Sequence, residues 1–401
     1  MNNISLTLSA KHTKFILWTL LFLTPIAGMA VDLVAPSLPA LSQHLHKTDA
    51  LIKLVITLYL MGYALGNFIT GFLSDAWGRQ KILRITLLGF VLASSLPIFL
   101  PTLSIVLISR IFQGLLLGSV AVSSRAIFSD ILPVEKLTAM GTLIGTMFGL
   151  GPVLGPIIGG YLQFYFGWQA CFTFFTSVSF VALIAVFFII PETHLNRHPL
   201  HLDTIKKNLS EVFKHKVFMG LVLIMGCAYS LVISFHTLAP FLIETELHGS
   251  SVFFGHLAFC LGLMFLASTF ISRHLLKKYP TEKLLFIVIY SFFGIAIIGL
   301  IISIFEPNNM LLIAIISGLM FYCTGSTFPM SMGKGMSLFR HIAGTATAIM
   351  YLINILFTSL ISFLLGFINT HSAIPLMWVN TSLLFMAFIF YWFLIKKRTI
   401  R

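Results

Sequence analysis

The sequence predicts an all-α integral membrane protein with twelve membrane-spanning helices arranged as two pseudo-symmetric bundles of six. Composition, recurring apolar runs and one long polar segment in mid-chain carry this prediction. Of 401 residues, 58% are hydrophobic and 9% are charged, and the mean hydropathy is +1.00. A water-soluble domain could not cover its surface with so few polar groups, so the composition excludes the soluble classes.

Apolar runs of about 20 residues recur along the whole chain, and each can cross a bilayer as a helix that satisfies its own backbone. The expected spans are residues 15–38, 51–73, 82–100, 103–124, 138–164, 169–190, 217–240, 252–272, 284–305, 309–331, 340–368 and 374–395. The first run is too long for a cleavable signal peptide, so we expect it to be retained.

The longest polar segment, residues 191–216, separates the first six spans from the last six. It begins with a proline and ends as a basic amphipathic stretch, as expected of a linker lying on a membrane face. The sequence therefore predicts bundles at residues 1–190 and 217–401. Three histidines of the linker lack an acid or cysteine at ligand spacing, so we expect neither a metal nor another cofactor.

The net charge of +13 reflects the orientation of the chain. All of the 25 Lys and Arg residues except Lys47, Lys53 and Arg110 are expected at the termini or in the loops on one side. The positive-inside rule then places both termini in the cytoplasm of a cell with an inner membrane. The basic balance indicates contact with anionic lipid and no nucleic-acid partner.

Asp32 lies within the first span, in AVDLVAPSLP at residues 30–39, and is the one acid of 12 that we place well inside a span. A charge at that depth costs about 3 kcal/mol and usually marks function. Apolar surroundings favour the protonated acid, whereas a nearby Arg110 would favour the ionised one. We therefore expect Asp32 to carry a proton; the alternative is a structural acid with a permanent partner.

A short internal repeat suggests a partner for this acid in the second bundle. Aligning VDLVAPSLP, residues 31–39, with FHTLAPFLI, residues 235–243, places Asp32 on His236. Transporters built from two six-helix halves show such a relation. Because histidine titrates near neutrality, His236 is a candidate second proton carrier or substrate ligand, and a packing histidine is the alternative.

The stretch GFLSDAWGRQK, residues 71–81, orders glycines and charges at a membrane boundary. Gly71 allows close packing, Gly78 makes a tight turn, and Asp75 and Arg79 carry opposite charges. The stretch resembles the signature between helices 2 and 3 of the major facilitator superfamily.

This resemblance implies a cytoplasmic gate. Arg79 would pair with Asp130 at the end of the fourth span. Asp75 would face the start of the eleventh span near residues 340–344, where a helix dipole favours an anion. These contacts are expected to break when the transporter opens inward; anchoring of the loop alone is the alternative.

Two further stretches resemble the same family. Arg110, Gln113 and Gly114 match an Arg-x-x-Gln-Gly pattern that implies a part in proton coupling, since a guanidinium keeps its proton and needs an acceptor. The fifth span matches the signature of the exporters, which are mostly proton antiporters. The matching residues are Gly151, Gly155, Pro156, Gly159 and Gly160.

The resemblance implies that this glycine face packs on the eighth span at Gly255 and Gly262. Small residues let membrane helices approach closely, and a plain dimerisation face is the alternative.

The first span narrows the resemblance to the Bcr/CflA branch of drug–proton antiporters. Asp32, Pro36, Leu38 and Pro39 match its pattern, whereas Val34 stands where an aromatic residue is common. We expect a largely apolar substrate cavity with a few polar and aromatic groups. Its candidate residues are Tyr59, Tyr63, Asn67, Gln113, Tyr229, Tyr322 and Asn354.

Together these features predict a monomeric proton-coupled antiporter that exports small lipophilic or drug-like compounds by alternating access. Three alternatives stay open. The first is a dedicated metabolite or siderophore transporter of the same superfamily, running outward or inward. The second is a sensor on a transporter scaffold. The third is a membrane enzyme, which the lack of a catalytic motif disfavours, so we expect no enzyme activity.

Overall fold

The computed structural model describes residues 9–193, 209–339 and 342–396, and every long element among them is a helix. We call the helices up to α7 the first half and those from α9 onward the second half. The first half comprises α1 (Ala10–Met29), η1 (Ala35–Ser37), α2 (Leu38–Leu45), α3 (Asp49–Trp77), α4 (Arg79–Phe99), α5 (Leu103–Ile131), α6 (Val134–Phe166) and α7 (Gln169–Ile189).

The second half follows the same plan. It comprises α9 (Lys216–Pro240), η2 (Phe241–Glu246), α10 (Ser251–Leu275), α11 (Thr281–Phe305), α12 (Met310–Leu338), α13 (Ala343–Leu365), α14 (Ile374–Phe390) and η4 (Tyr391–Lys396). Leaving out the short α2, each half contributes six long helices. The described part thus confirms the predicted twelve-helix architecture.

Local sequence signals fix where these helices begin. Thr102, Ser250 and Asn309 accept hydrogen bonds from backbone N–H groups in the first turns of α5, α10 and α12. Such caps satisfy donors that a helix start leaves open. Gly78, with φ of 96°, makes the turn from α3 to α4, in a region that residues with a Cβ rarely adopt.

Ten helices of the described part are long and apolar enough to cross a membrane. Many of their large apolar side chains point away from the protein: Phe188 is 79% exposed and Phe305 is 80% exposed. Such exposure is costly in water and favourable against lipid tails. The chain is therefore a multi-pass membrane protein.

The expectation of one continuous first span over residues 15–38 is wrong. Helix α1 ends at Met29, and residues 30–34 form turns in which Val34 N–H donates to the Val31 carbonyl at 3.2 Å. Helical structure resumes with Pro36 in η1 and Pro39 in the first turn of α2. A proline has no N–H to donate, so it suits a helix start and disrupts an interior. Asp32 consequently lies in the break, not within a helix.

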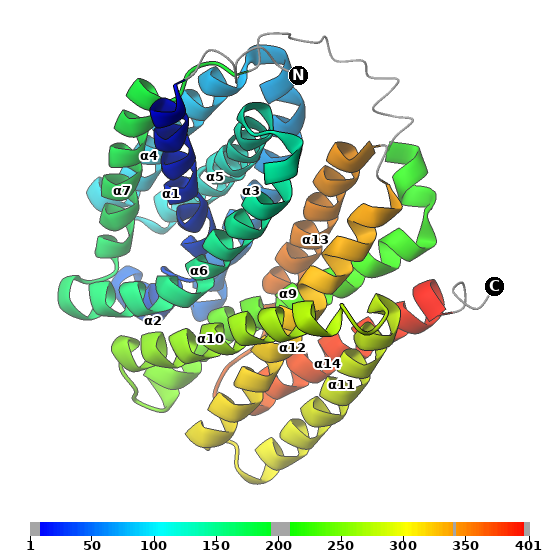
Figure 1. Ribbon diagram of the computed structural model, residues 1–401. Helices are drawn as coiled ribbons and strands as arrows, with labels where there is room; N and C mark the ends of the chain where they lie inside the picture. Colours follow the sequence, from blue (N-terminus) through cyan, green and yellow to red (C-terminus); the bar gives the residue numbers. More distant parts are fainter. Residues whose placement is uncertain (1–8, 194–208, 340–341, 397–401) are drawn as a thin grey trace.

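The two halves meet along α3 with α13 and α6 with α10. We call the end of the molecule at which α1 begins the inner end and the opposite end the outer end. Figure 1 shows the helices of the two halves diverging toward the inner end. Ile233, Phe241 and Ile355 of the second half are buried in the core of the first. The halves are thus joined by a packed interface that includes the break after α1.

Candidate functional site

The structure brings Asp32 and His236 together between the halves. His236 Nε2 lies 3.3 Å from Asp32 Oδ1, which joins the break after α1 to the outer part of α9. Both side chains are almost inaccessible, with 3% and 0% of their surfaces exposed. The internal repeat therefore located a real contact partner, and the role of the pair is taken up below as a proposal.

The other ring nitrogen of His236, Nδ1, makes a hydrogen bond within α9. Nδ1 lies 2.9 Å from the Val232 carbonyl, which can only accept, so Nδ1 carries the hydrogen. In the neutral ring, Nε2 presents a lone pair, which suits a protonated Asp32. In the protonated ring, Nε2 carries a hydrogen, which suits an ionised Asp32. Nε2 and Asp32 Oδ1 are within ion-pair distance, and Nε2 makes no hydrogen bond with the described residues in this arrangement.

Apolar rings enclose the histidine. Phe235, Phe254 and Phe321 place their centroids 5.7, 6.3 and 5.9 Å from the His236 ring. Separated charges are poorly stabilised in such surroundings, so an ion at either residue would depend on the other for compensation.

Arg110 lies in the same region without an ion pair to Asp32 among the described contacts. Its Nε donates to the Val55 carbonyl at 3.1 Å, and its terminal nitrogens donate to Gln113 Oε1 at 2.9 Å and the Ala30 carbonyl at 3.0 Å. The guanidinium also lies 4.3 Å from the centre of the Tyr59 ring. Arg110 therefore fixes the backbone two residues before Asp32, and its bonding capacity is largely used.

The glycine face of α6 packs mainly on the break after α1. A Cβ at Gly151 would lie 2.4 Å from the Gly28 carbonyl carbon, and one at Gly159 would lie 2.0 Å from the Leu33 oxygen. At Gly155 it would come within 3.0 Å of the Asp32 Cβ. This face positions the acid directly, a function that sequence reasoning did not foresee.

The expected packing of this face on the eighth span holds only in part. A Cβ at Gly160 would meet the Ser251 carbonyl oxygen at 2.4 Å, and one at Gly255 would meet the Pro156 oxygen at 2.7 Å. A Cβ at Gly262 would lie 3.0 Å from the Val153 Cα. The glycines of this signature thus allow close packing on two neighbours, because α6 lies between the α1 break and α10.

The predicted gate pair is present at the inner end. Arg79 donates to Asp130 Oδ2 at 3.0 Å, and Thr193 donates to the same oxygen at 2.8 Å. The backbone N–H of Arg79 also donates to Glu192 Oε1 at 3.0 Å. Sequence reasoning missed Glu192 and Thr193, which follow α7. Glu192 and Thr193 begin the predicted linker, so the described contacts tie the start of this segment to the first half.

The rest of the gate is less fully described. The side chain of Asp75 and residues 340–341 lie outside the described residues, so that contact stays a prediction. The close packing expected at Gly71 is wrong, because an added Cβ would meet nothing within 4 Å. In α5, Gly114 is tightly packed instead, since its Cβ would lie 2.0 Å from the Tyr59 carbonyl oxygen.

Five of the predicted cavity residues lie on α3, α9 and α13, of which α13 packs on both of the others. Tyr59, Tyr63 and Asn67 are buried along α3, whereas Asn354 is buried on α13. Tyr229 of α9 packs against the core of the first half and places its ring 6.0 Å from Phe328. They form a closely packed polar and aromatic seam.

Two predicted cavity residues are placed elsewhere. Tyr322 stacks on Phe292 of α11 at 5.9 Å, so it packs within the second half. Gln113 accepts from Arg110 and donates to Ser94 at 3.2 Å, which commits it to the first half. A helix that is apolar all round does not reveal from sequence which side faces a partner.

Lys53, near the start of the predicted second span, joins the halves at the outer end. The residue is 1% exposed, and its Nζ donates to the Ile368 carbonyl just beyond α13 at 2.7 Å. Nearby, Thr57 and Ser362 hydroxyls lie 2.9 Å apart, and Ser359 donates to the Thr57 carbonyl at 3.0 Å. We call these five residues the outer lock. The sequence signal was a lysine inside an apolar run.

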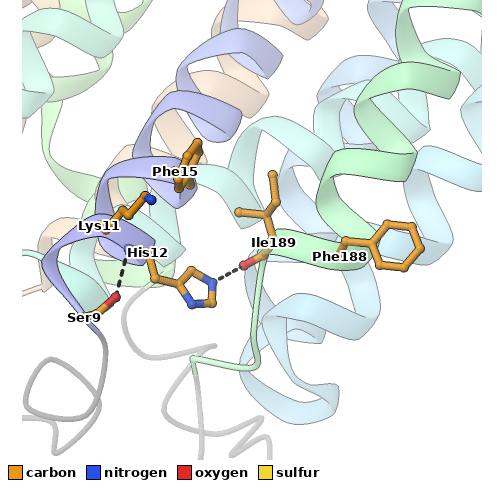
Figure 2. A pocket seen from close by; sticks show the side chains of 6 residues that line it. All are labelled: Ser9, Lys11, His12, Phe15, Phe188 and Ile189. Carbon is orange, nitrogen blue, oxygen red and sulfur yellow. Dashed lines mark hydrogen bonds between the residues drawn. The ribbon is translucent and has the colours of Figure 1, made fainter.

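A shallow groove of about 390 Å³ lies at the inner end between α1 and α7. Figure 2 shows His12 there, with its Nε2 2.7 Å from the Ile189 carbonyl. The groove is built from the first half alone and lies at the opposite end from the break that holds Asp32, so it is not the candidate site.

The fold and the paired halves are those of a membrane transporter. The sequence model of the Major Facilitator Superfamily matches residues 20–362, and the chain belongs to this family. Transporters of this family move small molecules within a membrane, and they are not enzymes.

Similar proteins bear several names. A Bacillus subtilis (strain 168) protein named "Uncharacterized MFS-type transporter YdgK" is 27% identical over 369 residues, covering 90% of each chain. A Haemophilus influenzae "Bicyclomycin resistance protein homolog" is 25% identical over 281 residues, covering 69% of this chain and 70% of its own. The solved structure of a D-xylose-proton symporter has a TM-score of 0.77 at 16% identity, covering 96% of this chain and 98% of its own.

Proposed function

We propose that this protein is a proton-coupled antiporter of a bacterial inner membrane, with both termini cytoplasmic. It exports small organic compounds, lipophilic or drug-like, by alternating access. The carrying observation is the contact between Asp32 and His236, two buried side chains that join the two halves. The resistance name of one relative agrees with export.

The pair exists only while the outer ends of the halves touch. Residues 1–190 and 217–401 move as two bundles about this site, linked by residues 191–216. When the outer end opens, Asp32 and His236 separate, and the proton that they share stays with one of them or leaves. Proton exchange is thereby tied to the change of access, which is what coupling requires.

The surrounding residues have supporting roles. Arg110 holds the backbone before Asp32, and Gly151, Gly155 and Gly159 let α6 bear on the same segment. Arg79 and Asp130 stabilise the inner end of the first half. Arg110 and the α6 glycines act on the pair through the position of the α1 break.

The test uses inverted membrane vesicles that carry an acid interior. Ethidium, rhodamine and fluorescein serve as probes, and release of the pH gradient on adding a probe reports exchange for protons. The wild type should dissipate the gradient with at least one probe, whereas Asp32→Asn should lose this response. If Asp32→Asn matches the wild type, the coupling role is refuted; if no probe works with the wild type, a dedicated carrier is favoured.

His236→Gln tests the partner, and His256→Gln is its matched control. His256 makes the same ring-to-carbonyl contact on α10, with Nδ1 2.8 Å from the Val252 oxygen, but it has no described carboxylate partner. We expect about a tenfold loss of coupled exchange for His236→Gln, the scale of one charge-assisted hydrogen bond, and none for His256→Gln. Equal behaviour of the two variants would remove His236 from the mechanism.

A further inference from the structure

Helix α5 carries two arginines, Arg110 and Arg125, that differ in how far their bonding capacity is used. They are separated along the helix by about 22 Å at 1.5 Å per residue. The guanidinium of Arg110 makes three hydrogen bonds and contacts the Tyr59 ring. The sequence had placed Arg125 in a loop, but it lies inside α5, which continues to Ile131.

Arg125 makes one described hydrogen bond, from a terminal nitrogen to Asn67 Oδ1 at 2.8 Å. A guanidinium has five N–H donors, so four remain for other acceptors. None of the described carboxylates lies within ion-pair distance of it. The side chain is only half-buried, so these donors can be reached.

The neighbours of Arg125 hold it in place without neutralising it. The amide of Asn67 donates to the Tyr63 carbonyl at 3.1 Å, which turns its oxygen toward Arg125. From the second half, the Tyr351 ring lies 4.8 Å from the guanidinium carbon. These groups are neutral, so the positive charge at this point of the interface is uncompensated by the described side chains.

We propose that Arg125, Asn67 and Tyr351 form a binding site for an anionic group of the transported compound, a carboxylate or a sulfonate. This inference rests on the proposed export function and adds the substrate class. The free side of a guanidinium presents parallel N–H groups that match two oxygens of such a group. The Tyr351 ring offers an apolar face to the body of the same molecule.

The site is separate from the proton pair. Asp32 lies near Ala30, which Arg110 contacts, so about half of α5 separates Arg125 from the pair. Arginine also keeps its charge across the accessible pH range. Anion binding should therefore persist in Asp32→Asn, which lets this inference and the coupling proposal fail independently.

The test is calorimetric titration of the purified full chain in neutral detergent, without a proton gradient. The probes are benzoate and benzenesulfonate, each compared with its uncharged amide, benzamide or benzenesulfonamide. For at least one pair, the wild type should bind the anion roughly tenfold more tightly than the amide. Arg125→Gln should abolish this preference, and Arg125→Lys should retain part of it. Arg273→Gln, which changes an exposed arginine of α10, should leave it intact.

Three results would overturn the inference. One is equal binding of anion and amide by the wild type. Another is an undiminished preference in Arg125→Gln. The third is loss of probe binding in nanodiscs when anionic phosphatidylglycerol replaces neutral lipid, which would assign the site to a lipid headgroup. Should Arg125→Gln not fold, Tyr351→Leu keeps the charge and should weaken anion binding a few-fold.

Discussion

In the outer half of the molecule a row of polar contacts joins the two halves, whereas in the inner half the described polar contact is the guanidinium of Arg125 over the Tyr351 ring. The outer row holds the Asp32–His236 pair, the outer lock and the bond from Ser251 to the Gly160 carbonyl at 3.1 Å. Among the described residues, every hydrogen bond between the halves lies on this side.

This difference between the two ends of the interface favours the state in which the outer end is closed. Opening the outer end requires a buried ammonium, the Asp32–His236 pair and several hydroxyls to lose their partners together. A cation–π contact is worth about 1 kcal/mol at a partly exposed site, so separating the inner end costs less. Under the proposed mechanism, ligand binding and proton exchange supply the free energy that opens the outer end.

The largest effect is expected where α6 bears on the α1 break. Gly159→Ala places a methyl group against the Leu33 carbonyl oxygen at 2.0 Å, which forces the backbones apart. We expect a loss of about 2 kcal/mol in the free energy of unfolding, within the usual range for overpacking. Thermal unfolding in detergent, followed with a thiol-reactive dye, measures it.

Gly294→Ala is the matched control for this substitution. It also changes a glycine inside a long helix, but an added Cβ would meet nothing within 4 Å. Alanine favours helix by about 1 kcal/mol, so this variant should be neutral or more stable. Equal destabilisation of the two variants would show that close approach at the break is not what Gly159 provides.

The second effect concerns the ammonium of the outer lock. Lys53→Met keeps the length of the side chain but removes the donor to the Ile368 carbonyl at 2.7 Å. A hydrogen bond to a charged group contributes about 1.5–3 kcal/mol, so the population open at the outer end should rise roughly tenfold or more.

A cysteine at the lock reports this opening. Ser359→Cys, with the lipid-facing Cys260 replaced by serine, should react with a polar maleimide about tenfold faster when Lys53→Met is present. Lys47→Met, which alters an exposed lysine of the same end, should not change the rate. An unchanged rate in Lys53→Met would mean that the ammonium does not hold the outer end closed.

Several of these features could be predicted from sequence, and the rest could not, for physical reasons. Apolar length located the spans, the repeat located His236, and a family signature located the Arg79–Asp130 pair. The break after Met29 was missed because its turn is buried and, apart from Asp32, made of apolar residues. The contacts of Lys53 and Arg125 were missed because their partners, Ile368 and Tyr351, are distant in sequence and known only after folding.

The smallest effect is expected at the hydroxyl pair of the outer lock. Thr57 and Ser362 are 6% and 0% exposed, and their oxygens lie 2.9 Å apart. Thr57→Val or Ser362→Ala alone leaves one buried hydroxyl without its partner and should cost about 1 kcal/mol. The double variant removes both hydroxyls, so it should lie within about 0.5 kcal/mol of the wild type.

A double-mutant cycle on unfolding midpoints measures this coupling. Additive losses, with the double variant worse than either single one, would show that the two hydroxyls act separately. The lock would then depend on Lys53 and on the bond from Ser359 to the Thr57 carbonyl. Non-additivity would instead show that the outer end is held by a set of mutually satisfied groups, which is why it opens only as a whole.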